Sequence, residues 1–173
     1  MSGLRVIACA SFRRDGPSEL HDLARALRAS DEKALDAVVA ILLAGLAREA
    51  PELASATGVA LVPMAGHHAA TVSGPAMRLV DRLCADHPGW LAALGPERIA
   101  DGPRAFDAGR RDPAAEAATI RWRAVAGSGP VLLVDDVVHS GASLDAAWFA
   151  APEHLRGRLV GLVAFRAEDF SRR

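Results

Sequence analysis

Several residue types that would point to particular functions are scarce in this chain. The only two cysteines, Cys9 and Cys84, are far apart and form no CxxC pair, which excludes a zinc ribbon and disfavours a disulfide framework. Lys33 is the only lysine, and its surroundings cannot supply a GxxxxGK[ST] phosphate-binding loop. The formal net charge is −1, whereas proteins held by nucleic-acid phosphates usually carry a basic excess. A nucleic-acid partner is therefore not expected.

Long apolar runs are also missing. The longest helical one, ALDAVVAILLAGLA at residues 34–47, is shorter than the ~20 residues of a membrane span. The apolar run near the N-terminus is too short for a signal peptide, and its arginines follow the run. The 173 residues are 51% hydrophobic and 24% charged, which suits one globular domain with its own core. We therefore expect a single-domain cytoplasmic protein over residues 1–173, without a membrane contact.

Hydrophobic periodicity predicts strands that alternate with helices. Strands are expected at 4–12, 58–64, 119–125, 130–135 and 158–165, and helices at 18–29, 30–50, 75–87 and 143–150. This order indicates an α/β fold, with a mostly parallel, Rossmann-like sheet flanked by helices. The segment around 95–118 is rich in Gly, Pro and Arg and is expected to form a mobile loop.

The stretch VLLVDDVVHSGAS at residues 131–143 places two acids after an apolar strand. Two ionised carboxylates so close together need hydroxyl groups, a cation or water nearby, and vicinal ribose hydroxyls are suitable donors. Side chains alternate along a strand, so Asp135 and Asp136 can serve one ligand only if the strand ends between them. We therefore expect the strand to end at Asp135 and the chain to turn there.

The residues that follow the acids suit an anion. Gly141 permits a backbone conformation that other residues avoid, and its small neighbours leave the amides of the loop accessible. The loop runs into the N-terminus of a predicted helix, where N–H groups and the helix dipole favour negative charge. A phosphomonoester fits this arrangement.

These thirteen residues resemble the phosphoribosyl pyrophosphate (PRPP) binding motif of the type I phosphoribosyltransferases. That motif has four apolar residues, two acids, two apolar residues, a variable residue, Thr or Ser, Gly, any residue, and Thr or Ser. The chain is most similar to the ComF-type, competence-associated branch. It lacks that branch's zinc ribbon, has SGPAMR at 73–78 in place of an RGFNQA-like stretch, and has His139 in place of the first Thr of its TTG loop.

The resemblance implies a phosphoribosyltransferase-like domain with defined site residues. The ribose and the 5′-phosphate would be bound by Asp135, Asp136, Val138, His139, Ser140, Gly141, Ala142 and Ser143. The candidate catalytic residues are Asp135, Asp136 and His139, although His139 has the alternative of contributing only its amide. The pyrophosphate is assigned to Met64, Ala65, Gly66, His67, Arg110 and Arg111. Mg²⁺ is expected to bind mainly through PRPP, without an all-protein metal site.

Two functions follow from this resemblance. The first is an enzyme that transfers the phosphoribosyl group of PRPP to a nitrogenous base and releases pyrophosphate. The second is a non-catalytic PRPP- or nucleotide-binding module linked to DNA uptake or repair, which the missing RGFNQA-like residues favour. Dimers are common in the family, so a homodimer is a further implication. The tryptophans Trp90, Trp122 and Trp148 are expected to pack, with base stacking as the alternative for Trp122.

Overall fold

Five parallel strands form the central sheet of the chain, which a computed structural model describes over residues 3–13, 18–66, 68–70, 72–101 and 112–168. Their order across the sheet is β1-β7-β6-β2-β3, and each neighbouring pair is parallel. The strands are β1 (Arg5–Arg13), β2 (Val59–Pro63), β3 (Trp90–Ala92), β6 (Val131–Val138) and β7 (Leu159–Glu168). The predicted α/β class with a parallel sheet is confirmed.

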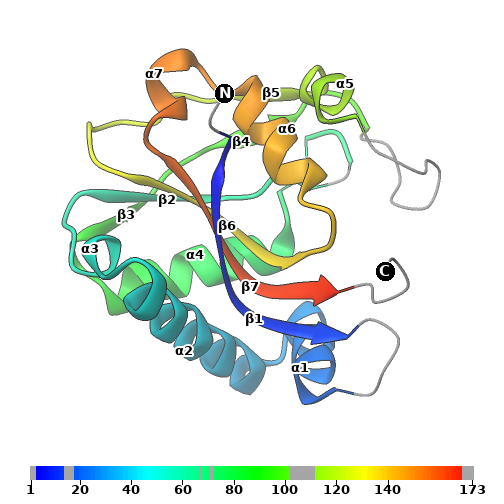
Figure 1. Ribbon diagram of the computed structural model, residues 1–173, viewed down its shortest axis with the longest axis vertical. Helices are drawn as coiled ribbons and strands as arrows, with labels where there is room; N and C mark the ends of the chain where they lie inside the picture. The colour runs from blue at the N-terminus through cyan, green and yellow to red at the C-terminus, as the bar shows by residue number, and fades with distance from the viewer. Residues whose placement is uncertain (1–2, 14–17, 67, 71, 102–111, 169–173) are drawn as a thin grey trace.

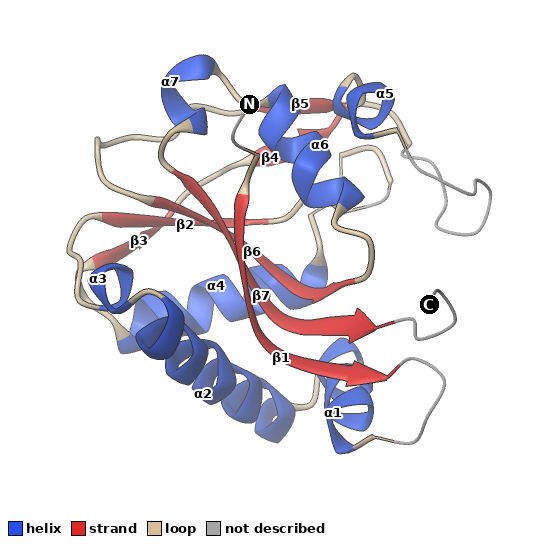
Figure 2. Cartoon of the chain, viewed as in Figure 1, coloured by secondary structure: helices blue, strands red, loops and turns tan. Residues whose placement is uncertain are grey.

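Helices cover both faces of this sheet (Figures 1 and 2). One layer holds α1 (Glu19–Arg28), α2 (Glu32–Glu49), α3 (Pro51–Ala54) and α4 (Gly74–Asp86). The other holds α5 (Pro113–Ala117), α6 (Ala142–Ala150), α7 (Glu153–Arg156) and the antiparallel pair β4 (Pro96–Arg98) and β5 (Ile120–Trp122). Within the described part of the chain, no helix is both long and apolar enough to cross a bilayer.

The apolar run of β6 explains why the sheet is covered on both sides. Leu132 and Val134 belong to the core cluster shared with α1, α2 and α4, while Val131 and Leu133 belong to the cluster shared with α6. This is the two-residue alternation of a strand buried on both faces. Each layer of helices therefore closes one of two hydrophobic cores.

Local sequence signals fix most helix starts. Asp31 accepts a hydrogen bond from the Ala34 amide at 2.8 Å and caps α2, as expected for an acid at the positive end of a helix. Ser73 caps α4, and Pro75 lies in its first turn, where its missing N–H costs no helical hydrogen bond.

Some boundaries differ from the predictions. β6 continues to Val138, so the expectation that the strand ends at Asp135 is wrong: its pairing with β7 extends to Val138 opposite Arg166. The expected loop at 95–118 contains β4 and α5, and its centre, 102–111, lies outside the described residues. The three-residue strand β3 was not predicted because it is too short to show a period, and its pairing with β2 creates it.

The order of the strands reverses between β2 and β6. From β2 the chain passes through α4 to β3 on one side, and from β6 it passes through α6 to β7 on the other side. In such sheets the crevice beyond the carboxyl ends of the two strands is the usual ligand site. The loops after Pro63 and after Val138 both lie at this point.

Gly45 sets how closely α2 can approach β1. A Cβ atom added at Gly45 would lie 2.4 Å from both Cβ and Sγ of Cys9, and 2.9 Å from its Cα. Burial at this contact raises the pKa of the Cys9 thiol to about 11. The missing side chain at position 45 therefore lets the longest helix lie on the first strand.

We predict that Gly45→Ala lowers the free energy of unfolding by about 1–3 kcal/mol, because helix and strand must separate. Gly157→Ala is the control, since an added Cβ there meets nothing within 4 Å, and it should change stability by less than about 0.5 kcal/mol. Urea denaturation of both variants measures the difference. Equal stabilities would contradict the packing constraint.

Candidate functional site

The two adjacent acids of β6 have different environments. Asp136 is only 5% exposed, and its Oδ2 accepts a hydrogen bond from Nε of Arg28 at 2.6 Å. Arg28 lies in the last turn of α1, and its own side chain is 54% exposed. Asp136 is thus held in an ion pair on the α1 side of the sheet, which a reading of the local motif could not reveal.

Asp135 is the more accessible acid. Asp135 is half-buried, whereas Asp136 is buried, and Oδ1 of Asp135 accepts a hydrogen bond from the Asp136 amide at 3.0 Å. Burial, followed by repulsion from the Asp136 carboxylate, raises the pKa of Asp135 well above its ordinary value. Asp135 is therefore a carboxyl group that gains from a hydroxyl donor or a cation beside it.

The loop after β6 makes a left-handed turn that leads directly into a helix. Gly141 has a φ of 80°, in the left-handed region, and directly precedes α6. The first hydrogen bond within α6 runs from the Asp145 amide to the Gly141 carbonyl at 2.9 Å, so the first-turn amides point out of the helix end. His139 and Ser140 are exposed. Within the loop the Ala142 amide donates to Oγ of Ser140 at 3.3 Å, so the Ser140 hydroxyl proton and further backbone amides are the donors that this loop offers.

Other residues of this predicted loop are more enclosed. Val138 and Ala142 are each 7% exposed, so they shape the loop and do not present side-chain groups. The Ser143 hydroxyl donates to Oε1 of the buried Glu116 at 3.0 Å. Because that proton is directed at a carboxylate, Ser143 can donate to an anion chiefly through its amide.

The loop after β2 starts beside the acids. The Met64 amide donates to the Val134 carbonyl at 2.9 Å, which extends the pairing of the two strands to the residue before Asp135. Met64 and Ala65 are 1% and 7% exposed, and the Gly66 carbonyl accepts from Nε of Arg98 at 3.0 Å. Of the other residues predicted to bind pyrophosphate, His67, Arg110 and Arg111 lie outside the described residues.

The tryptophans pack as expected. The Trp90 indole N–H donates to the Ala56 carbonyl at 3.1 Å, and the Trp122 indole N–H donates to the Ala147 carbonyl at 2.8 Å. Trp148 lies edge-on to Phe149. Each tryptophan therefore has a packing role, and that of Trp122 links β5 to α6.

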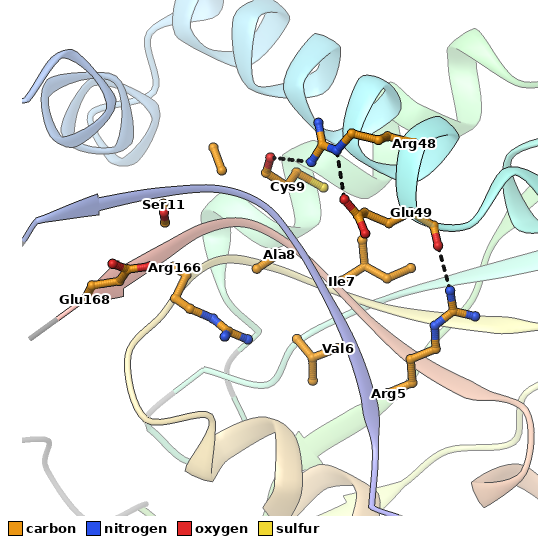
Figure 3. A pocket seen from close by; sticks show the side chains of 11 residues that line it. Arg5, Val6, Ile7, Ala8, Cys9, Ser11, Arg48, Glu49, Arg166 and Glu168 are labelled. Atoms are coloured by element: carbon orange, nitrogen blue, oxygen red, sulfur yellow. Dashed lines mark hydrogen bonds and ion pairs between the residues drawn. The ribbon is translucent and has the colours of Figure 1, made fainter.

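A concave region lies along the edge strand β1 (Figure 3). It encloses about 460 Å³ and is bordered by Arg5, Arg48 and Arg166 together with Glu49 and Glu168. Arg5 and Arg48 are already engaged, since Arg5 donates to the Glu49 carbonyl and Arg48 to the Glu49 carboxylate. None of the residues predicted from the motif borders this region, and we favour the β2–β6 edge as the site.

Comparison of the chain with protein-family models, curated proteins and solved structures found no match. Among the residues with described positions, no three His, Cys, Asp or Glu side chains gather as a metal-binding group. The function is therefore inferred from the chemistry of the β2–β6 edge.

We predict that Asp135→Asn stabilises the protein at pH 8. A carboxyl group whose pKa is raised by folding opposes folding once pH exceeds its unfolded pKa, and this penalty grows until pH passes the folded pKa. The amide variant has no such penalty, and its oxygen can still accept from the Asp136 amide.

The difference in Tm between Asp135→Asn and wild type should shrink as pH falls toward 4. Thermal unfolding from pH 4 to 8 measures it, with Asp22→Asn as the control because that side chain is 74% exposed. A stability gain that does not depend on pH would contradict this account of Asp135.

We predict that Arg28→Ala lowers the free energy of unfolding by about 1–3 kcal/mol, because it leaves the Asp136 carboxylate buried without its cation. Arg25→Ala, in the same helix with a side chain 71% exposed, should cost less than about 0.5 kcal/mol. In a double-mutant cycle with Asp136→Asn, the two losses should not add. Additive losses would show that the pair does not stabilise the fold.

Proposed function

We propose that this chain binds PRPP with Mg²⁺ at the carboxyl ends of β2 and β6. We further propose that it transfers the phosphoribosyl group to a nitrogenous base and releases pyrophosphate. The observation that carries the proposal is the left-handed Gly141 turn at the N-terminus of α6, which follows β6 where the strand order reverses. The resemblance of residues 131–143 to the PRPP-binding motif supports the same ligand.

The 5′-phosphate would bind at the start of α6. The amides of the first turn and the Ser140 hydroxyl are hydrogen-bond donors at this helix end, and the helix dipole adds favourable potential. A side chain larger than hydrogen at position 141 would be strained at a φ of 80°. The small residues of this loop would therefore permit both the left-handed turn and the close approach of a phosphate.

The ribose hydroxyls would be held by Asp135. Donation from two vicinal hydroxyls would favour the ionised form of this carboxyl group and offset its burial and its repulsion from Asp136. Oδ2 of Asp136 accepts from Nε of Arg28, which favours a supporting role for Asp136 over direct contact with the ribose. We propose that Asp136 and Arg28 support the ribose site and do not form its second half.

The site also fits a magnesium ion that arrives with PRPP. Asp135 offers hard carboxylate oxygens on a half-buried residue of β6, and Mg²⁺ commonly binds through one or two carboxylates together with ligand phosphates. When bound, the ion would neutralise charge on the pyrophosphate oxygens.

The proposed reaction breaks the bond between the anomeric carbon and pyrophosphate and forms a bond from that carbon to the nitrogen of the base. Positive charge develops on the sugar ring, and the Asp135 carboxylate would stabilise it electrostatically. The half-exposed guanidinium of Arg28, close to both acids, would add positive charge near the departing anion. Positioning of PRPP and the base by the two loops would supply the rest of the rate acceleration.

Binding without transfer is the second candidate function. Two observations favour it: the Asp136 carboxylate is committed to Arg28, and the Ser143 hydroxyl is committed to Glu116. Both interactions remove side-chain groups from direct contact with a ligand. In that case the chain would act as a PRPP- or nucleotide-sensing module, with the link to DNA uptake or repair that the resemblance suggests.

Calorimetric titration with PRPP, with and without Mg²⁺, tests the proposal. We expect Mg²⁺ to strengthen binding and Asp135→Asn/Asp136→Asn to abolish it. Asp135→Asn alone, which should fold at least as well as wild type, is expected to weaken binding at least about tenfold, the effect of losing a charged hydrogen-bond acceptor. Asp86→Asn, at the far end of α4, should bind as wild type does.

Pyrophosphate release in the presence of a panel of nucleobases separates the two functions. Release that depends on a base supports transfer, whereas tight binding without release supports the sensing module. Absence of PRPP binding to the folded wild-type protein would refute both. A cytoplasmic location and a homodimer belong to the same proposal and are checked by cell fractionation and analytical ultracentrifugation.

A further inference from the structure

A buried ion pair lies between the two loops of the candidate site. The side chains of Arg98, from β4, and Glu116, from α5, are 1% and 0% exposed, and Nη2 of Arg98 donates to Oε1 of Glu116. Arg98 also donates through Nη1 to Oγ1 of Thr119 at 2.5 Å and through Nε to the Gly66 carbonyl at 3.0 Å. The same Oε1 atom of Glu116 accepts from the Ser143 hydroxyl at 3.0 Å.

These contacts connect the loop after β2 to the start of α6. Gly66 belongs to the first and Ser143 to the second, and the Arg98–Glu116 pair is the bridge between them. The loop after β2 has further anchors to the same region, since the Ala70 amide donates to the Arg98 carbonyl at 2.7 Å and the Ala69 amide to Oδ1 of Asp101 at 2.8 Å. Two segments that are far apart in sequence are thus joined through β4 and α5.

Stability alone is a poor explanation for this pair. The desolvation of two charges offsets much of their attraction, and apolar side chains of similar volume are often as stabilising at a buried site. The pair also constrains geometry, because a planar guanidinium donates its hydrogen bonds at fixed angles and so orients the acceptors. Here it orients a backbone carbonyl, a carboxylate and a hydroxyl at the same time.

We infer that Arg98 and Glu116 are positioning residues that hold the Gly66 loop at a fixed place relative to the N-terminus of α6, so that both loops engage one ligand with two phosphate-bearing ends. This inference rests on the proposed function. Neither side chain touches the ligand, since both are buried. They would act by fixing the spacing between the two loops. Binding by both loops strengthens the affinity for one ligand only when this spacing matches the separation of the ligand's two phosphate-bearing ends.

Ribose 5-phosphate and PRPP separate this effect from binding at one loop. Ribose 5-phosphate has only the phosphate that α6 would bind, and PRPP adds the pyrophosphate at the other loop. The ratio of their dissociation constants therefore reports how well the second loop is positioned. A positioning pair should change this ratio, whereas a pair that only stabilises the fold should not.

The test variant is Arg98→Met/Glu116→Leu, which removes both charges together and leaves neither unpaired. Its matched control is Arg123→Met/Glu97→Leu, because Glu97 of β4 and Arg123, directly after β5, form an ion pair on a more exposed surface of the same antiparallel pair. Calorimetry with each ligand, in the presence of Mg²⁺, gives the two dissociation constants. Thermal unfolding checks that both variants fold.

We expect the test variant to bind ribose 5-phosphate within about threefold of wild type and to lose at least about tenfold of the preference for PRPP. The control should keep both affinities. An unchanged preference in the folded test variant would overturn the inference while leaving the proposed function intact. Failure of the wild-type protein to bind either ligand would instead refute the proposed function, and the inference with it.

Ser143→Ala is a second variant that leaves no buried charge unpaired, because Glu116 keeps Arg98. It removes only the link from the network to α6. A loss of affinity for PRPP without a loss of affinity for ribose 5-phosphate supports the positioning role. Equal losses for both ligands would show that the Ser143 hydroxyl contacts the phosphate directly, and would overturn the inference.

Discussion

The pairing of β2 with β6 is the constraint on which the candidate site depends. Four residue pairs from Ala60–Val131 to Pro63–Val134 hold the strands in parallel, and the Met64 amide continues the pairing at its carboxyl end. The chain leaves these two strands toward opposite sides of the sheet, and the edge beyond two such strand ends is the usual ligand site of parallel sheets. An acid, a left-handed turn and a helix N-terminus then meet at one edge.

The charges near this edge fall into two groups. Asp136 and Glu116 are buried, and each is paired with an arginine that comes from a distant segment, Arg28 or Arg98. Asp135 is different, because burial and the neighbouring acid raise its pKa. An acid that opposes folding at neutral pH is a feature of a binding or catalytic position, where stability is commonly lower than it could be.

In the proposed site, the two arginine–carboxylate pairs have separate roles. Arg28 holds Asp136, which would support the ribose site, and Arg98 holds the loop that would face the pyrophosphate. Asp135 and the amides of α6 are then the groups that would touch the ligand. The proposed arrangement would use backbone amides for phosphate binding, which a chain with one lysine can supply.

The sequence by itself determined the class of fold and the position of the candidate loop. The apolar runs at 58–64, 130–135 and 158–165 encode buried strands by local pattern, and the residues Ser140, Gly141 and Ala142 encode the turn before α6 because only small side chains suit it. Hydrophobic periodicity and the conformational freedom of glycine are local properties, which a single sequence displays.

Only the tertiary structure decided which charges are available to a ligand. Arg28 and Asp136 are 108 residues apart, and Arg98 and Glu116 come from separate elements, so no motif could show that these groups neutralise each other. The length of β6 was decided in the same way, since its last residues are held by pairing with β7 and not by a local signal. Long-range pairing depends on the geometry of the whole sheet, and this geometry left Asp135 as the accessible acid of the two.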